Sequence, residues 1–162
     1  GADVVFLPIY YQPASQILVA ADSLGYTPTF FGCDGMDGIL TLKGFDMALA
    51  EGLYMLTPFS ADATDTKTVD FVTNYKAKYG EVPNQFAADA YDAVYAIKTA
   101  LEAAGATADM STADITSALV AQFTTMSFDG VTGSGVTWNA NGEVSKDPKA
   151  VVITDGAYAA AD

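Results

Sequence analysis

The chain has 162 residues, of which 51% are hydrophobic and 17% charged, a composition typical of a folded globular protein. Seven lysines, no arginine and no histidine face twenty carboxylates, giving a formal net charge of −13. This shortage of cations argues against binding to nucleic-acid phosphates or to an anionic membrane surface. Without histidine the chain can form no Ser-His-Asp triad, no Cys-His pair and no His-ligated zinc site, and its single cysteine can form no internal disulfide.

The first thirty residues combine strand and helix signals. The apolar run VVFLP (4–8) predicts a buried strand. A helix is expected over 12–24, because Pro13 suits its first turn and Gly25 its end. The apolar run 28–31 predicts a second strand, and this order indicates a parallel βαβ unit with a right-handed crossover. The apolar face expected for the helix consists of Ile17, Ala20, Ala21 and Leu24.

Further elements follow along the chain. A short helical piece around 45–50 leads to a third strand near 53–57. Asn141-Gly142 and Asp155-Gly156 are hairpin turn signals, and the second of them lies within the closing strand segment. Together the elements predict an α/β protein with a mainly parallel sheet and flanking helices. Capping residues and apolar spacing predict three longer helices, over 65–79, 87–104 and 112–123.

Aromatic and acidic residues follow the first two strands where each strand ends, the second time within FFGCDGMDG (30–38). In open α/β sheets, ligands bind beyond the carboxyl ends of the strands. If the two strands are neighbours, we expect Tyr10, Tyr11 and Asp34 to line one crevice. The tyrosines would supply an apolar wall with a polar handle, and the carboxylate would pair with an ammonium group. Gly35 would let the backbone approach a ligand closely.

Each of these residues also has a purely structural interpretation. Tyr10 and Tyr11 are equally suited to packing, and Asp34 to an ordinary turn. Asp37 is expected to be a helix cap or turn residue. Cys33 is expected to be a small buried apolar residue, since no histidine can activate it. Asp34 and Asp37 lack the spacing of a calcium EF-hand loop, so we expect neither a metal site nor a catalytic group here.

Four segments in collinear order carry a resemblance to a known family. They are VVFLPIYYQPASQILVAADSLGYTPTFFGCDG, AEGLYMLTPF, FVTNYKAKYGEVPNQFAADAYDAVYAIKTALEAAG and GVTGSGVTWNANGEVSKDPKAVVITDGAY. They resemble the C-terminal half of branched-chain amino-acid binding proteins, the type I solute-binding components of ABC importers. The resemblance covers nearly the whole chain and is specific in combination. It implies a two-lobed periplasmic-binding-protein fold that closes around a small ligand.

The resemblance implies roles for a few residues. Tyr10 falls where the family has a tyrosine that packs on the ligand. Asp34 falls where the family places an acidic residue, usually Glu, against the ligand's α-ammonium, although Asp is one methylene shorter. Some members contribute a bulky aromatic from a region near the hinge, where Ala88 stands in this chain and Phe86 is the nearest candidate. No cofactor is implied.

The resemblance also implies a division of the chain. Residues 1–57 would belong to the ligand-binding lobe, 58–147 would form helices and a hairpin of the other lobe, and 148–162 would return to the first. Family members are much longer, and the chain opens in a strand, so we expect a fragment without the N-terminal half. The three long helices would then be uncovered, which favours association through a homo-oligomer or a swapped dimer. Their expected apolar stripes include Val69, Val72, Tyr75 and Tyr79, then Ala90, Val94, Ile97 and Leu101.

The function that the resemblance implies is non-catalytic binding of a small zwitterionic amino acid and its delivery to a membrane permease. Such a protein works outside the cytoplasmic membrane, and we expect no signal segment within these residues. Three alternatives stay open: a ligand sensor of the same fold, an enzyme using Asp34 with a tyrosine or lysine, and an interaction module with an acidic surface. Calorimetry against a panel of amino acids would discriminate among these classes.

Overall fold

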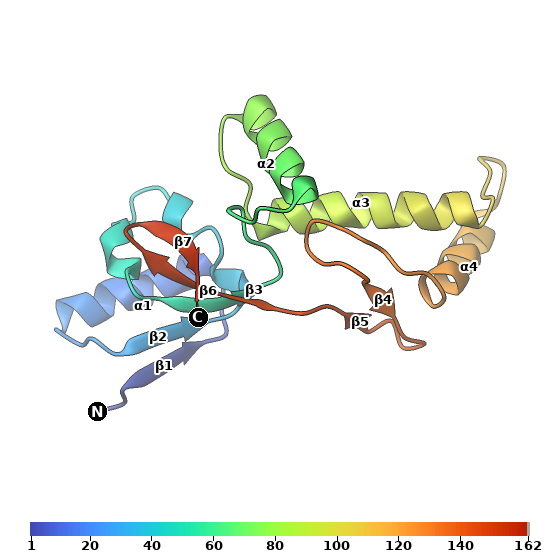
Figure 1. The fold of residues 1–162 in the computed structure, drawn as a ribbon. Helices are drawn as coiled ribbons and strands as arrows, with labels where there is room; N and C mark the ends of the chain where they lie inside the picture. The colour runs from blue at the N-terminus through green and yellow to red at the C-terminus, as the bar shows by residue number, and fades with distance from the viewer. Residues whose placement is uncertain (162) are drawn as a thin grey trace. The chain divides into compact units, whose positions relative to one another are not determined.

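The computed structural model describes residues 1–161, and the chain forms two compact units (Figure 1). Unit 1 consists of Gly1–Thr64 together with the segment from Pro148 onward, and unit 2 consists of Asp65–Asp147.

Unit 1 is built on a five-stranded sheet in the order β1-β2-β3-β6-β7. The first two pairings, β1 with β2 and β2 with β3, are parallel, whereas β3 with β6 and β6 with β7 are antiparallel. The expected α/β class is confirmed, and the sheet is mixed. Its elements are β1 (Val4–Leu7), α1 (Tyr11–Ser23), β2 (Thr29–Gly32), η1 (Asp34–Met36), η2 (Ile39–Thr41), η3 (Met47–Ala50), β3 (Tyr54–Thr57), β6 (Lys149–Thr154) and β7 (Ala157–Ala160).

The antiparallel pairing of β6 with β7 follows from a two-residue turn. Asp155 and Gly156 both have positive φ, 54° and 71°, as a tight hairpin between β6 and β7 requires. A turn of this length can join only antiparallel strands, whereas α1 provides the long crossover that β1 and β2 need to be parallel. The expected turn at Asp155-Gly156 is confirmed.

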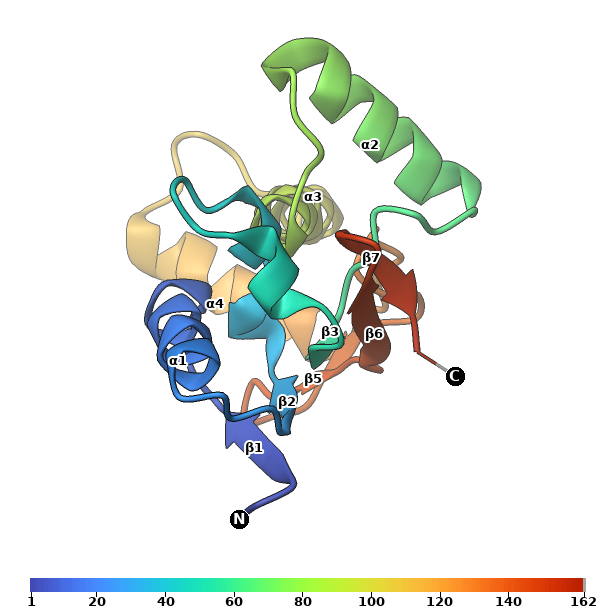
Figure 2. The same cartoon turned by 90° about the vertical axis from the view of Figure 1, so that its left-hand side faces the viewer.

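Helix α1 covers one face of this sheet and forms the core of unit 1 with it (Figure 2). Its buried positions include Ala14, Leu18 and Ala21. The apolar face expected for this helix is only partly correct, because Ile17 is 37% exposed and Leu24 81% exposed. Both faces of the helix carry apolar side chains, so spacing alone cannot identify the face that meets the sheet. The core contains Leu7, Ala14, Leu18, Met36, Ile39, Ala50, Leu53, Met55, Val151 and Ile153.

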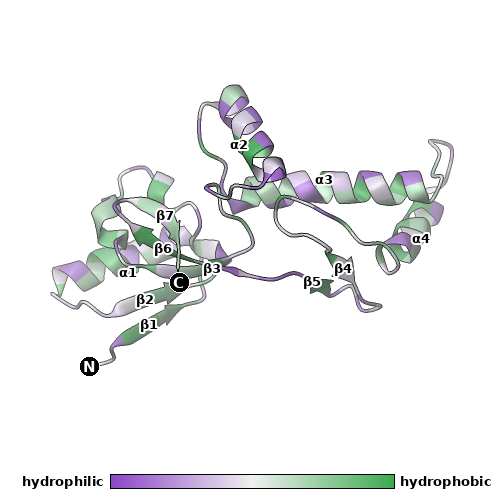
Figure 3. Cartoon of the chain, viewed as in Figure 1, coloured by the Kyte–Doolittle hydropathy of each residue, from purple (hydrophilic) through white to green (hydrophobic). Residues whose placement is uncertain are grey.

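The opposite face of the sheet carries a row of apolar side chains. Phe6, Phe31, Tyr54 and Val152 are paired in register from β1 to β6. The rings of Phe6 and Phe31 lie 6.0 Å apart, yet Phe6 is 56% exposed and Tyr54 40% exposed. Strands β1 and β6 accordingly show mostly hydrophobic colours (Figure 3). This face is therefore an open apolar surface.

Unit 2 contains the three long helices and a short hairpin. Each of these helices follows a capping residue, since the side chains of Asp65, Asn84 and Ser111 accept hydrogen bonds from backbone N–H groups in the first turn. The second helix starts at Gln85 and not at 87, because Asn84 is its cap. The elements are α2 (Thr66–Tyr79), α3 (Gln85–Ala103), α4 (Thr112–Phe123), β4 (Thr137–Trp138) and β5 (Val144–Ser145).

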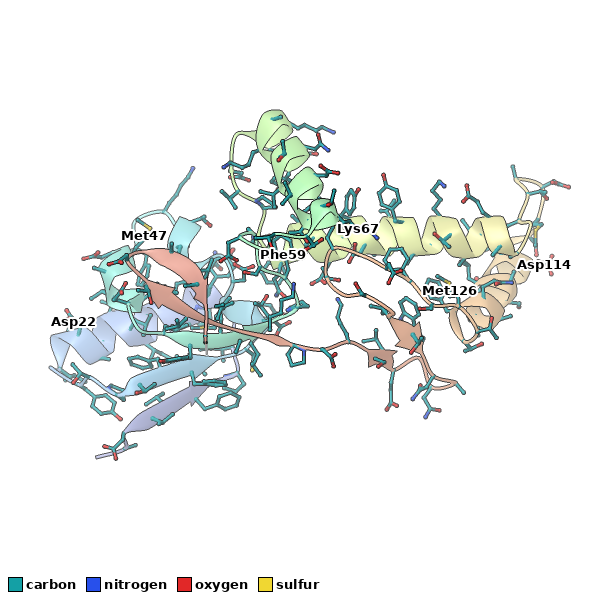
Figure 4. The ribbon with its side chains drawn as sticks, viewed as in Figure 1. Asp22, Met47, Phe59, Lys67, Asp114 and Met126 are labelled. Atoms are coloured by element: carbon teal, nitrogen blue, oxygen red, sulfur yellow. The ribbon has the colours of Figure 1, made fainter. Side chains whose placement is uncertain are left out.

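Two side chains, those of Asp92 and Lys67, connect the loop before β4 to the helices of unit 2 through hydrogen bonds. The carboxylate of Asp92 on α3 accepts hydrogen bonds from the N–H of Val131 at 2.9 Å and from the N–H and Oγ1 of Thr132 at 2.8 and 2.6 Å. The ammonium of Lys67, at the start of α2 in Figure 4, donates to the backbone oxygen of Asp129. Because Asp92 is only 8% exposed, these bonds satisfy a buried carboxylate.

The apolar stripes expected on these helices are largely exposed. Val94 is 65% exposed and Ile97 43% exposed on α3, and no residue of α4 is buried. The side chains that α3 does bury are Gln85, Ala88, Asp92, Ala96 and Ala100. The exposure of Val94 and Ile97 agrees with the expectation that these helices are uncovered in this chain.

Candidate ligand-binding site

The carboxyl ends of β1 and β2 meet at one edge of the sheet, as parallel pairing requires. The turn after β2 runs through η1, and it lies against the end of β1. A Cβ atom on Gly35 would lie 3.0 Å from the carbonyl oxygen of Ile9 and 3.3 Å from Cδ1 of Tyr10. Only glycine allows this approach without displacing one of the two segments. The structure thus brings Tyr10 and Gly35 together.

Both residues expected to contact a ligand most directly are accessible at this edge. Tyr10 is 66% exposed and occupies the cap position before α1, and Asp34 is exposed at the first position of η1. The turn is narrow, with the Asp37 N–H bonded to the Asp34 carbonyl oxygen at 3.1 Å. An exposed aromatic ring and an exposed carboxylate on adjacent segments can together contact an organic cation.

Tyr11 lies at the first position of α1, in a different environment. It is half-buried and packs against the hydrophobic core. Its ring faces Gly38, where a Cβ atom would lie 3.2 Å from Cε1 of the tyrosine. Gly38 also has φ of 105°, a backbone conformation that favours glycine. Tyr11 therefore supports the turn from below as well as bordering the edge.

Phe86 belongs to unit 2, unlike the other candidates. It lies in the first turn of α3 and is 38% exposed, whereas Ala88, two residues later, is fully buried. At this position of α3 it is Phe86, and not Ala88, that presents an accessible side chain.

Sequence reasoning missed the residues that hold the turn from inside. Asp37 lies within the turn, as expected, yet its side chain is only 4% exposed. It accepts a hydrogen bond from the hydroxyl of Tyr158 on β7, and that hydroxyl oxygen accepts one from the N–H of Gly38 at 3.2 Å. Burial, and next the negative charge of Asp37, raise the pKa of Tyr158 above that of an exposed tyrosine. No local signal joins residues 120 positions apart.

Cys33 precedes this turn and is a free, half-buried thiol. It was expected to be buried, and the structure corrects that expectation, because Cys33 stands between the buried Gly32 and the exposed Asp34. Within residues 1–161, no cluster of three or more His, Cys, Asp or Glu side chains could hold a metal ion.

Two grooves lie outside this edge. One, of about 500 Å³, lies between α2 and α3 and has aromatic walls that include Phe71, Tyr75 and Tyr91. The other, of about 460 Å³, is lined by Gln12, Gln16 and Lys43 among others. The residues that line them do not include Tyr10, Asp34 or Gly35.

Comparison with solved structures identifies proteins of the same architecture. A leucine binding protein, LivK, from Thermotoga maritima shares 25% identity and a TM-score of 0.80, over 99% of this chain and 44% of that one. The substrate binding protein LivJ from Streptococcus pneumoniae, solved in complex with isoleucine, shares 27% identity and a TM-score of 0.80 over the same shares. A substrate-binding protein from Desulfitobacterium hafniense in complex with Leu has the same fold, with 23% identity and a TM-score of 0.74, over 98% of this chain and 43% of that one.

The chain thus spans less than half the length of these three proteins. A comparison with curated protein sequences finds no match. None of the helices described in the structure is both long and apolar enough to cross a membrane. The model of the family described as periplasmic binding protein matches residues 1–157, nearly the whole chain. The chain therefore belongs to the periplasmic binding protein family.

Proposed function

We propose that the chain is part of the substrate-binding component of an ABC importer for amino acids of the branched-chain type. The observation that carries the proposal is its likeness to LivK and LivJ, which extends over 99% of the chain. The names of those proteins specify leucine and branched-chain amino acids, and one was solved with isoleucine. The proposed role is binding, not catalysis.

In this role the carboxylate of Asp34 pairs with the ligand's α-ammonium, and the ring of Tyr10 packs against the ligand. Gly35 allows the backbone to approach the ligand, and Tyr11 borders the pocket from the start of α1. The exposure of Tyr10 and Asp34 on adjacent segments supports this assignment. A buried charge pair with an ammonium is strong only when water is excluded, which a closing cleft accomplishes.

The remaining contacts belong to the second lobe in this proposal. Residues 1–57 and 148–162 are assigned to one lobe and 58–147 to the other, with Phe86 shaping the pocket for the ligand side chain. The rest of the cleft is supplied by residues that correspond to the part of LivK and LivJ that this chain does not cover. Closure of the lobes presents a shape that a membrane permease recognises, outside the cytoplasmic membrane.

Isothermal titration calorimetry tests the proposal. A panel of amino acids, including leucine, isoleucine, valine, glutamate and lysine, is titrated into a longer form of the protein that extends over the length of LivK and LivJ. We expect dissociation constants on the order of micromolar or tighter for the branched apolar ligands only. No heat with any amino acid would contradict the proposal, and tight binding of a non-zwitterionic ligand would redirect it.

A further inference from the structure

We propose that Tyr158 and Asp37 are positioning residues that hold the turn bearing Asp34 in the geometry needed to meet a ligand's ammonium group. The role of these residues in ligand binding rests on the proposed function, whereas their role in holding the turn does not. The two residues lie on β7 and directly after η1, and together they join the last strand of the chain to the strand-end turn.

The first observation is the burial of Asp37. Its side chain is 4% exposed, and the residues on either side of it, Met36 and Gly38, are also buried. A carboxylate removed from water needs hydrogen-bond donors, and the Tyr158 hydroxyl is one of them. The turn therefore cannot move away from β7 without breaking a bond to a buried charged group.

The second observation is that the same hydroxyl contacts the turn backbone. The N–H of Gly38 donates to the Tyr158 oxygen at 3.2 Å, so one phenol contacts a side chain and a main-chain group of the turn at once. The ring of Tyr11 closes against Gly38 from α1, and Gly35 lies against the end of β1. Contacts from the segment between β1 and α1, from α1 and from β7 thus converge on the turn.

Hydrogen bonds within the turn link Asp34 to the contacts of Tyr158 with Asp37 and Gly38, which together are called the clamp below. The Asp34 carbonyl oxygen accepts the N–H of Asp37 at 3.1 Å, and the Cys33 carbonyl oxygen accepts the N–H of Met36 at 3.0 Å. These bonds make the turn a single tight unit. Because Asp34 is exposed and begins η1, the direction of its carboxylate depends on the turn that Asp37 anchors.

A phenylalanine at position 158 would keep the ring and lose only the hydroxyl. Its packing against the core would remain, since Tyr158 packs there beside the buried cluster. What disappears is the donor to Asp37 and the acceptor for Gly38. Tyr158→Phe therefore separates the clamp from the general stability of unit 1.

Cys33 provides a native reporter of the turn, because it is the only cysteine of the chain and is half-buried. The rate at which a thiol reagent labels this half-buried residue rises when the turn opens more often. We expect Tyr158→Phe to raise this rate at least about fivefold, as loss of a hydrogen bond to a charged group implies. The increase should not depend on urea at low concentration, because local opening exposes little surface.

Two further variants keep the test decisive. Asp37→Asn should accelerate labelling in the same way, and it replaces Tyr158→Phe if that variant does not fold. Tyr26→Phe is the matched control, since it removes a hydroxyl that donates to Ala2 at an exposed site of the same unit. It should leave the Cys33 rate unchanged. An unchanged rate in both clamp variants, or an increase that follows global unfolding in urea, would overturn the clamp.

The role of Tyr158 in ligand binding is tested separately, by affinity measurements on the longer form of the protein. Leucine is compared with 4-methylpentanoate, which has the same side chain and carboxylate and no ammonium group. We expect Tyr158→Phe to lower the affinity ratio of leucine to 4-methylpentanoate at least about fivefold. An unchanged ratio beside faster Cys33 labelling would reject the positioning role. Absence of leucine binding by the unmodified protein would instead reject the proposed function and leave the clamp standing.

Discussion

At the scale of single residues, the turn between Cys33 and Gly38 shows why small side chains stand at fixed places. Gly35 lies against the Ile9 carbonyl oxygen, and Gly38 combines φ of 105° with contact to the Tyr11 ring. A larger residue at either position would bring its Cβ atom against a neighbouring group, and at position 38 it would also strain the backbone. The glycines therefore allow the turn that bears Asp34 to pack closely against the segment that bears Tyr10 and Tyr11.

We expect Gly38→Ala to lower the free energy of unfolding of unit 1 by about 1–3 kcal/mol, because the backbone strain and the Tyr11 contact act together. Urea unfolding monitored by circular dichroism measures the change. Gly44→Ala is the comparison, since Gly44 also has positive φ, 80°, and has open space around it. A cost for Gly38→Ala no greater than that for Gly44→Ala would show that the Tyr11 contact contributes nothing.

Tyr158 makes the stability of unit 1 depend on pH in the alkaline range. Its pKa is raised in the folded chain, chiefly by burial and then by the charge of Asp37. Its full contribution is therefore present below the pKa of an unfolded tyrosine, about 10, and it is lost as pH rises above that value. We expect stability to fall more steeply above that pH in the original chain than in Tyr158→Phe, as measured by urea midpoints across pH. Equal slopes would contradict the raised pKa.

At the scale of elements, helix α3 and the loop before β4 are held together by one carboxylate. Asp92 accepts three hydrogen bonds from Val131 and Thr132, and Gly130 lies so close that a Cβ atom there would overlap the carboxylate. A helix and an irregular loop share few apolar contacts, so a buried charged acceptor is an effective way to join them. This contact of Asp92 joins residues about 40 positions apart in the sequence.

Asp92→Asn should destabilise unit 2 by about 1.5–3 kcal/mol, because an amide nitrogen would face backbone donors in place of an acceptor oxygen. Loss of helical circular dichroism in urea is the measurement. Asp89→Asn serves as the control on the same helix, since Asp89 pairs with Lys146 at 3.1 Å on the partly exposed surface and should matter by less than about 1 kcal/mol. Equal effects of the two substitutions would contradict the role of Asp92 in joining α3 to the loop.

The elements were largely predictable from the sequence, and their burial was not. Helix starts depend on local capping, so the starts of α2 and α4 beside Asp65 and Ser111 were predictable, whereas the start of α3 after Asn84 was placed two residues too late. Which face of a helix is buried depends on its neighbours, and Val94 and Ile97 have the spacing of a core stripe while lying exposed. The contact of Tyr10 with the turn followed from parallel strand ends. The contact of Asp37 with Tyr158 did not, because it joins distant segments.

At the scale of the molecule, both units carry open apolar surface. In unit 1 it is the sheet face that includes Phe6 and Tyr54, and in unit 2 it is the exposed side of α3 and α4, with Val94 and Val120 at 65% and 60% exposed. Contiguous apolar surface of this kind favours association. A net charge of −13 opposes it by repulsion, more weakly as salt screens the charges.

We therefore expect the isolated chain to self-associate, and more strongly at high salt. Sedimentation velocity over a range of protein concentrations measures this. The double substitution Val94→Lys and Val120→Lys should reduce association, whereas Leu24→Lys, at an exposed site after α1, should change it little. A monomer at every concentration and salt would contradict the expectation.

The assignment of Asp34 to a ligand's ammonium is tested most directly by calorimetric titration of leucine into the longer form of the protein. We predict that Asp34→Asn weakens binding by about 2–5 kcal/mol, because the buried ammonium loses its counter-charge. Asp22→Asn, an exposed carboxylate near the end of α1, should leave the affinity unchanged. Equal affinities of Asp34→Asn and the unmodified protein would contradict the assignment.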